Sequence, residues 1–303
     1  MKVIVLGAGA IGSLYAAKLA PRHDVTVVGR AAHVDAINQR GLRVIGREEM
    51  TCHVRAATQV ESIGPDTLLL LTTKVNDNRL AVEPLTDKLH EDTIILCVQN
   101  GLAGEDVVKA IVGGRCPVLR AITQFGAIFR APGLIEYKVE GHTLVERNPH
   151  SARIAALLTA SGLDGRVAAD IRVEVWRKLI FNCVINPITS IVGGEVGSIA
   201  DPRLDPLKRL VIDECLAVAR TAGVSFDVDP DFDFLRAIAD LFGPSTNVAS
   251  MRQDLLKGKA TEIEHMNDAV VELGRRLGVG CPVNAALAAI IRAMEARGRF
   301  VVP

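Results

Sequence analysis

Short apolar runs separated by polar turns fill the first half of this chain. The main runs cover residues 2–6, 24–28, 66–73 and 93–98. Continuous runs of Val, Ile and Leu of this length are typical of strands buried on both faces of a parallel sheet. After the third run a polar helix is expected to reach about His90, with a break at Pro84. A β-rich stretch at 116–147 and a short strand at 166–169 complete what we predict to be an α/β domain.

From about residue 170 onward the pattern becomes helical, and Gly-Gly, Asp-Pro, Gly-Pro and Cys-Pro pairs mark the boundaries. The expected helices cover residues 171–192, 204–222, 231–241, 246–257, 260–278 and 283–297. No fixed-period repeat and no low-complexity tract is visible in the sequence. The predicted architecture is therefore an α/β domain at 1–168 followed by an all-α domain at 169–303.

The turn after the first run has a dinucleotide-binding pattern, Gly7-Ala8-Gly9-Ala10-Ile11-Gly12. Strand, glycine turn, helix and second strand follow one another within about thirty residues, which is the context that this fingerprint requires. Gly7 permits a tight turn, Gly9 lets the backbone approach a pyrophosphate, and Gly12 allows the helix to pack on the strand. The helix N-terminus then faces the phosphate charge. We therefore predict a Rossmann-type domain that binds a dinucleotide through Gly7, Gly9, Ala10, Ile11 and Gly12.

The end of the second strand indicates which dinucleotide is bound. Sites for NAD usually have an acidic residue there, which takes the ribose 2′-hydroxyl. This chain has no acid at that point and instead has Arg30. Because a planar guanidinium pairs well with a phosphate, the sequence favours NADPH. The alternative is that Arg30 is an ordinary surface residue.

Two polar side chains follow later strands of the predicted sheet. Lys74 comes after the third run, and Asn100 after the fourth. Ligands of open parallel sheets bind beyond the carboxyl ends of the strands, so both residues are candidate cofactor contacts. The alternatives are a solvated loop lysine and an Asn-Gly turn that has no other role.

One predicted helix of the second half, 171–192, is apolar on most sides, with polar residues at Lys178, Asn182 and Asn186. Each step of four turns about 40°, so the three lie within about 80° of one another on one face. A buried ammonium and buried amides are costly unless they are hydrogen-bonded, so this row is a candidate site for an oxygen-rich small molecule. The alternative is a lysine that reaches solvent and amides that bind neighbouring backbone.

A second polar stretch contains Ser250 and Glu262, which are twelve residues apart. On a straight helix the two side chains would point about 120° apart. They can serve one site only if the helix breaks between them, and Gly258 is the expected break. The alternative is a charged helix exposed to solvent.

Charge and composition argue against several classes of function. Lysine and arginine together number 35, as do aspartate and glutamate, and this balance argues against a nucleic-acid partner. No apolar run is long enough to cross a membrane. The six cysteines form no C-x-x-C pair, which indicates reduced thiols in a cytoplasmic protein. The seven histidines have no ligand-like spacing, so we expect no metal site and interpret them as structural or surface groups.

Taken together, these motifs resemble the ketopantoate reductase (2-dehydropantoate 2-reductase) family over the whole chain. The likeness rests on the glycine turn, Thr73-Lys74, Gln99-Asn100-Gly101, the helix motif from Trp176 to Pro187, and Ser250-Met-x-Gln-Asp254 with Thr261-Glu262-Ile263. One departure is the segment 193–197, Gly-Gly-Glu-Val-Gly, where many members carry a Cys-Pro-Asn-Gly type turn that lends another polar contact.

The resemblance implies an oxidoreductase that uses NADPH to reduce ketopantoate to pantoate, for pantothenate and coenzyme A biosynthesis. It implies that Lys178 is the general acid for the keto oxygen and that Glu262 is its partner and a substrate or ribose contact. It implies substrate hydrogen bonds from Asn182, Asn186, Asn247 and Ser250. It implies cofactor contacts near the reacting end from Lys74 and Asn100, and a 2′-phosphate contact from Arg30.

Three other functions stay open from the sequence. The departure at 193–197 leaves room for a different 2-oxo acid as substrate. A protein that binds NADPH without catalysis is a second alternative, although the presence of Lys178 and Glu262 argues against it. An opine-type dehydrogenase, which would need an amine co-substrate, is a more distant one. Whether the chain forms a homodimer is also left open.

Overall fold

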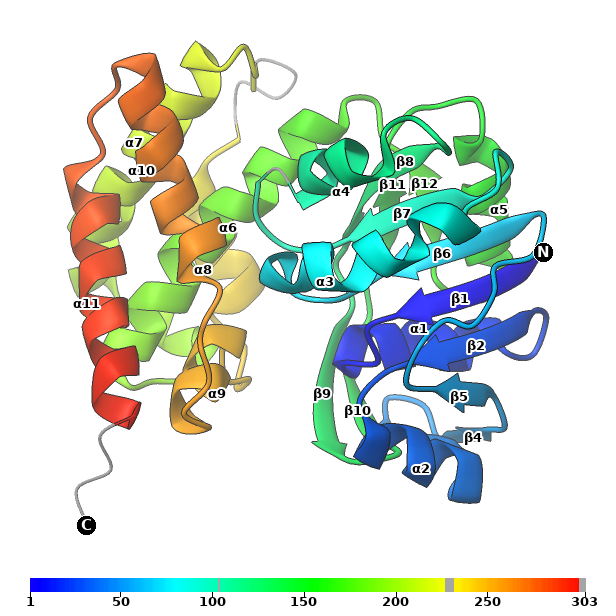
Figure 1. Ribbon diagram of the computed structural model, residues 1–303. Helices are drawn as coiled ribbons and strands as arrows, with labels where there is room; N and C mark the ends of the chain where they lie inside the picture. The colour runs from blue at the N-terminus through cyan, green and yellow to red at the C-terminus, as the bar shows by residue number, and fades with distance from the viewer. Residues whose placement is uncertain (103, 227–231, 300–303) are drawn as a thin grey trace. The chain divides into compact units, whose positions relative to one another are not determined.

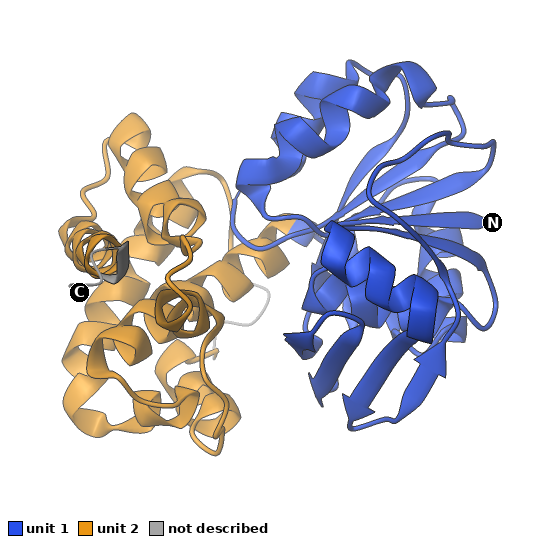
Figure 2. Ribbon diagram, turned by 60° about the horizontal axis from the view of Figure 1, so that its bottom comes forward, with its two compact units in different colours: residues 1–171 blue, residues 172–303 orange. Residues whose placement is uncertain are grey.

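A computed structural model describes residues 1–102, 104–226 and 232–299 of the chain. The chain divides into two compact units, residues 1–171 and 172–303 (Figures 1 and 2). The division falls at the first residues of the long helix α6 (Ile171–Val192). The first unit is mixed α/β and the second is helical, so the expected fold class is confirmed.

The described part of the first unit contains an eight-stranded sheet in the order β12-β11-β8-β7-β6-β1-β2-β5. Its strands are β1 (Lys2–Leu6), β2 (Asp24–Val28), β5 (Arg55–Ala57), β6 (Thr67–Leu71), β7 (Ile94–Val98), β8 (Val118–Thr123), β11 (Thr143–Val145) and β12 (Gly165–Val167). All neighbouring pairs are parallel except β8 and β11. Leu6, the last residue of β1, pairs with Val28 on one side and Leu71 on the other. Strand order therefore reverses at β1, and a reversal of this kind creates the ligand-binding crevice of such sheets.

A smaller sheet packs against the same unit. It has the order β4-β3-β10-β9, with β3 (Leu42–Gly46), β4 (Met50–Cys52), β9 (Gly126–Ala131) and β10 (Leu134–Val139). Side chains from this sheet, among them Val44 and Ile135, join the core beneath helix α1 (Ala10–Leu19). The β-rich stretch expected at 116–147 thus contributes to both sheets.

Alternate side chains of the central strands serve two different cores. On one face, Val5 and Leu70 pack with Leu14 of α1 and with α5 (Ser151–Ala160). On the other face, Leu69 and Leu71 pack with residues of α3 (Asn78–Val82), the 3₁₀ helix η2 (Glu83–Lys88) and α4 (Gly104–Val112). Because both faces are covered, the central strands are apolar at most positions, as the sequence pattern predicted, with exceptions such as Lys2 at the start of β1.

The remaining helices of this unit agree with the sequence in type and less well in their bounds. Helix α2 (Ala31–Arg40) begins immediately after Arg30. The polar helix expected before His90 is divided into η1 (Val75–Asp77), α3 and η2, and Pro84 lies in the first turn of η2. The predicted break at Pro84 is confirmed, because proline has no N–H to continue the preceding helix.

The second unit consists of helices. Its α-helices after α6 are α7 (Asp205–Thr221), α8 (Phe234–Phe242), α9 (Ser250–Leu256), α10 (Asn267–Leu277) and α11 (Pro282–Arg299). Its 3₁₀ helices are η3 (Val196–Ala200), η4 (Pro202–Leu204) and η5 (Ile263–His265). None of the helices within the described residues combines the length and the apolar content that a membrane span requires.

Three of the predicted helices of this unit begin several residues later than expected, among them the helix expected at 246–257, which begins at Ser250. The helix expected at 260–278 is wrong in its first part, because η5 and an irregular Met266 (φ −113°, ψ −103°) precede α10. The helix expected at 231–241 begins at Phe234, and residue 231 lies outside the described residues. Asp233 accepts hydrogen bonds from the main-chain N–H groups of Leu235 and Arg236, so it caps this helix.

Candidate functional site

The glycine turn after β1 leaves backbone open for a ligand. A Cβ on Gly7, which has φ +110°, would lie 2.6 Å from the main-chain nitrogen of Thr73, and one on Gly12 would collide with the carbonyl oxygen of Gly7. By contrast, no described atom outside Gly9 and its two chain neighbours lies within 4 Å of the position that a Cβ on Gly9 would take. Among the described residues no side chain caps the N-terminus of α1, and its first turn contains no acid. This terminus is therefore suited to an anion, and the cofactor contacts of Gly9, Ala10 and Ile11 stay predictions.

Arg30 lies next to this turn. The N–H groups of Gly7 and Ala8 both donate to the carbonyl oxygen of Val28, at 3.0 Å. A Cβ on Gly29 would lie 2.6 Å from that of Ala8, so the end of β2 is held against the glycine turn. Arg30 itself is exposed and is the N-cap residue of α2, whose first turn contains no acid. The contact of this exposed cation with a 2′-phosphate stays a prediction.

The side chain of His33 links several elements near the glycine turn, and the sequence did not predict these contacts. Its Nε2 atom lies 3.1 Å from Ser13 Oγ, and its Nδ1 atom accepts a hydrogen bond from Gly133 N–H at 2.8 Å. Since Nδ1 is an acceptor, the ring is neutral and carries its proton on Nε2. Burial lowers the pKa of His33 below its ordinary value of 6.5. The residue is structural, as expected of the histidines, and it connects α1, α2 and the turn before β10.

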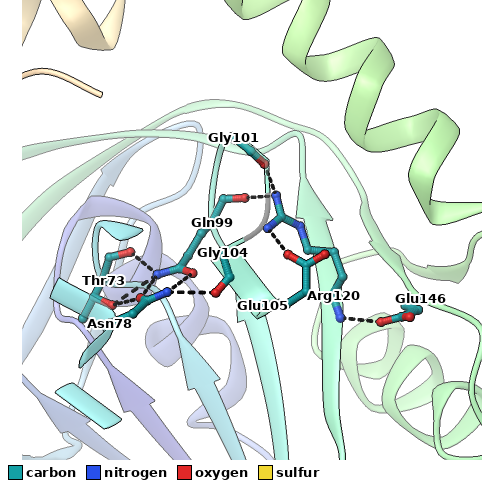
Figure 3. A network of polar contacts seen from close by, with 8 residues as sticks. All are labelled: Thr73, Asn78, Gln99, Gly101, Gly104, Glu105, Arg120 and Glu146. Carbon is teal, nitrogen blue, oxygen red and sulfur yellow. Dashed lines mark hydrogen bonds and ion pairs between the residues drawn. The ribbon is translucent and has the colours of Figure 1, made fainter. Parts of the chain in front are cut away.

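A buried amide network joins the ends of β6 and β7 (Figure 3). Gln99 Nε2 donates to the carbonyl oxygen of Thr73 at 2.8 Å and to Asn78 Oδ1 at 2.5 Å. Asn78 Nδ2 donates in return to Gln99 Oε1 and to the carbonyl oxygen of Gly104, each at 3.1 Å. Thr73 and Gln99 immediately precede the predicted cofactor contacts Lys74 and Asn100. The network therefore fixes the two segments that carry these contacts relative to each other.

Arg120 on β8 adds an ionic part to this network (Figure 3). Its side chain is 2% exposed and pairs with Glu105, at 2.8 Å between Nη1 and Oε2. Its Nη2 atom donates to the carbonyl oxygens of Gln99 and Gly101, both at 2.8 Å. Arg120 was not among the predicted site residues, although an arginine inside the apolar run 118–123 is a signal that something must pair with it.

The polar row on α6 has the predicted spacing. Lys178 and Asn182 are half-buried, whereas Asn186 is buried and its Nδ2 atom lies 3.5 Å from Met266 Sδ as a hydrogen-bond donor. Around the row, Leu179, Ile180 and Cys183 are fully buried, so the interpretation of a helix enclosed on most sides is confirmed. The substrate roles of the three polar residues stay predictions.

Pro187 interrupts the hydrogen bonding of α6 without ending the helix. Proline has no N–H, so the carbonyl oxygen of Cys183 loses its usual helical donor. Asn267 supplies a replacement, because its Nδ2 donates to that oxygen at 3.1 Å. The same Nδ2 donates to Asn284 Oδ1 at 2.9 Å, and Asn284 in turn donates to Glu214 at 2.7 Å. Met266 and Asn267 thus attach the segment that follows Glu262 to the helix that carries Lys178.

The stretch from Ser250 to Glu262 breaks where the sequence predicted. Helix α9 begins at Ser250, which is exposed, and ends at Leu256. Gly258 follows in the left-handed region, with φ +62°, and the half-buried Glu262 precedes η5. The two candidate residues therefore do not lie on one straight helix, although Ser250 and residues 256–260 are exposed. Their roles at the site remain predictions.

The altered segment 193–197 contacts the predicted substrate segment. Val196 N–H donates to the carbonyl oxygen of Asn247 at 2.7 Å, and Gly197 N–H to that of Ser245 at 2.8 Å. Arg252 Nη1 donates to the carbonyl oxygen of Gly194 at 2.5 Å. The departure from the family pattern therefore lies directly against Asn247 and the start of α9.

The remaining titratable groups indicate no further chemistry. All six cysteines are free, and burial raises the pKa of the Cys183 thiol well above its ordinary value. A thiol with a raised pKa is a poor nucleophile, so we interpret Cys183 as structural. Within the described residues, no group of three or more His, Cys, Asp or Glu side chains could hold a metal ion.

Comparison with known proteins identifies relatives over the full length. The chain matches the family models described as "Ketopantoate reductase PanE/ApbA" at residues 3–150 and "Ketopantoate reductase PanE/ApbA C terminal" at residues 170–295. The 2-dehydropantoate 2-reductase of Pyrococcus horikoshii is 34% identical over 305 residues, which cover 98% of this chain and 99% of that protein.

Solved structures show the same architecture. A PanE/ApbA family ketopantoate reductase from Ralstonia eutropha JMP134 has a TM-score of 0.89 and 30% identity, covering 99% of this chain and 100% of that one. The ternary structure of D-mandelate dehydrogenase with NADH and anilino(oxo)acetate also has a TM-score of 0.89 and the same coverage. At 24% identity the second likeness concerns the fold alone.

Proposed function

The chain belongs to the ketopantoate reductase family, and from that premise we propose that it reduces 2-dehydropantoate to pantoate with NADPH. The observation that carries the proposal is the pairing of two features in one chain. One is a glycine turn with open backbone at the N-terminus of α1, and the other is the Lys178, Asn182 and Asn186 row on a buried helix.

The residues at the glycine turn fit a dinucleotide that carries a 2′-phosphate. Gly9 leaves room for a pyrophosphate, and the first turn of α1 offers N–H groups without a competing carboxylate. Arg30 provides a cation where NAD-binding chains usually have an acid. When bound, NADPH supplies a hydride for the carbonyl carbon of the substrate. Lys74 and Asn100 would hold the reacting end from the strand ends that Gln99 joins.

The protein contributes the proton and the orientation of the substrate. As the carbonyl carbon is reduced, the carbonyl electron pair moves onto oxygen, and the Lys178 ammonium stabilises that charge and donates a proton to it. The resulting amine takes a proton back from solvent. We propose that Glu262 keeps this ammonium in place, while Asn182, Asn186, Asn247 and Ser250 bind the substrate carboxylate and hydroxyl.

A different 2-oxo acid as substrate is the second candidate, and the segment 193–197 favours it. That segment departs from the family pattern and contacts Asn247 through Val196. A change in its shape alters the position of Asn247 and therefore the space near the substrate. The enzyme would then keep its chemistry and prefer a 2-oxo acid of another shape.

Steady-state kinetics decides between these candidates. The ratio kcat/KM measures discrimination between substrates, so it is compared for ketopantoate and a set of branched and aromatic 2-oxo acids with NADPH. The first proposal expects the highest value for ketopantoate and pantoate as the product. A higher value for another 2-oxo acid supports the second candidate, and binding of NADPH without turnover of any 2-oxo acid contradicts both.

Two further proposals concern the cellular location and the oligomeric state of the protein. The six free thiols support a cytoplasmic location, where glutathione and thioredoxin keep cysteines reduced. A homodimer is the oligomer that we propose to test, by measuring the molar mass of the purified protein in solution by light scattering.

A further inference from the structure

The buried side chain of Arg120 forms hydrogen bonds with the turn that carries Asn100. Arg120 Nη2 donates to the carbonyl oxygen of Gln99 and to that of Gly101, at 2.8 Å each. These are the carbonyl groups of the residues on either side of Asn100. Figure 3 shows the guanidinium directed at both of them from β8. The turn is therefore held on both sides of the residue that is proposed to contact the cofactor.

The arginine is itself firmly placed. Its Nη1 atom pairs with Glu105 Oε2 at 2.8 Å, and its main-chain N–H donates to Glu146 Oε2 at 2.9 Å. A Cβ on Gly104 would lie 3.3 Å from Nη1 and 3.0 Å from Gln99 Oε1, so there is little free space around the guanidinium. A charge this deeply buried is retained only where its hydrogen bonds compensate for lost hydration. Here Nη1 pairs with Glu105 and both bonds of Nη2 go to the turn, whereas Nε has no partner among the described residues.

The turn needs such a support. Gly101 has φ +84°, a conformation that glycine adopts readily and that alternates easily with others. Asn100 has a short side chain, so its reach is decided by the main chain that carries it. A planar guanidinium with several fixed donors can restrain two carbonyl groups at once, whereas an ammonium is a single point of charge.

We propose that Arg120 is a positioning residue for the nicotinamide end of NADPH, acting through the main chain on both sides of Asn100. This inference rests on the proposed function, because it assumes that Asn100 contacts that end of the cofactor. The side-chain bonds of Arg120 go to Glu105 and to the turn around Asn100, whereas we assign the adenosine end to Gly9 and Arg30 at the ends of other strands. Replacing Arg120 should therefore weaken binding of the nicotinamide end of NADPH more than binding of the adenosine end.

The test compares binding of NADPH with binding of 2′-phospho-ADP-ribose, which lacks the nicotinamide. Affinities are measured by calorimetry for the wild type, Arg120→Met, Arg120→Lys and the control Arg153→Met, in which an exposed arginine of the same unit loses its ion pair with Asp66. Arg120→Met is expected to weaken NADPH binding about tenfold or more and to leave binding of the fragment within about twofold, since the bonds that it removes go to Glu105 and to the turn around Asn100. Arg120→Lys keeps the charge beside Glu105, so its NADPH affinity is expected to lie between that of the wild type and that of Arg120→Met.

Several outcomes decide the proposal. Equal loss of affinity for NADPH and for the fragment in both Arg120 variants would show a general disruption of the unit and overturn it. Wild-type affinities in Arg120→Lys and Arg120→Met would overturn it as well. If Arg120→Met does not fold, the ratio of the two affinities in Arg120→Lys decides alone. Failure of the wild type to reduce ketopantoate contradicts the proposed function but leaves this affinity ratio measurable, so the two failures are distinguishable.

Discussion

The side-chain amide of Asn267 donates a hydrogen bond to the carbonyl oxygen of Cys183, over 3.1 Å. That oxygen is available because the residue four positions later is Pro187, which has no N–H. Both partners are fully buried. The bond holds the start of α10, and with it the segment of Glu262, to the helix of Lys178. A family motif that contains a proline inside a helix is thus completed by an asparagine far away in the sequence.

This relationship predicts a specific coupling between two substitutions. Asn267→Leu leaves a buried carbonyl without a donor, so we expect it to lower the free energy of unfolding by about 1–3 kcal/mol. In the background of Pro187→Ala the main chain regains an N–H for the same oxygen, and the cost of Asn267→Leu should become smaller by about 1 kcal/mol. Urea denaturation of the two single variants and the double variant measures the coupling. Strictly additive effects would contradict it.

The local sequence was sufficient to predict α6 but not the long-range hydrogen bonds that hold this helix in place. The expected helix at 171–192 agrees with Ile171–Val192 because apolar residues and helical spacing continue through it. Asn267 lies 84 positions after Cys183, and no local pattern indicates that these two residues meet. The same holds for Arg120, whose acceptors on the β7 turn lie 21 and 19 positions before it. Motifs thus located the candidate contacts, and long-range hydrogen bonds fix their positions.

The helix expected at 260–278 shows where periodicity misled the prediction. Ile263 and Met266 are both buried, as they would be on one face of a helix. The chain nevertheless turns through η5 and Met266 before α10 begins, because Asn267 is fixed by its bonds to Cys183 and Asn284. Here tertiary hydrogen bonds outweigh local helix propensity.

Arg30 is expected to decide between the two nicotinamide cofactors. Arg30→Ala removes a cation that would face the 2′-phosphate and should raise KM for NADPH about tenfold or more, with little change for NADH. Arg40→Ala, which removes an exposed arginine at the other end of α2, is the matched control and should change neither. Steady-state kinetics with both cofactors measures the ratio. Equal losses for NADPH and NADH would exclude a 2′-phosphate role.

Lys178 is expected to act in the chemical step and not in cofactor binding. Lys178→Ala should lower kcat by about 10²–10⁴-fold, the usual contribution of a positioned proton donor. NADPH affinity should remain close to that of the wild type, because the proposed phosphate contacts lie at the glycine turn. Lys257→Ala, at an exposed position after α9, is the control. Near-normal turnover by Lys178→Ala would remove this lysine from the mechanism.

The neutral His33 predicts a pH dependence of stability at the dinucleotide-binding unit. Burial lowers the pKa of His33 in the folded protein below 6.5, so the unfolded chain binds its proton more readily. The stabilisation is complete above about pH 6.5 and is lost as the pH falls through the folded-state pKa, since a protonated Nδ1 cannot accept from Gly133 N–H. The difference in unfolding free energy between the wild type and His33→Gln should therefore be constant above about pH 6.5 and shrink below it. Denaturation at a series of pH values measures this difference, with His53→Gln as an exposed control. A difference that grows toward acidic pH would show that His33 is held as a cation.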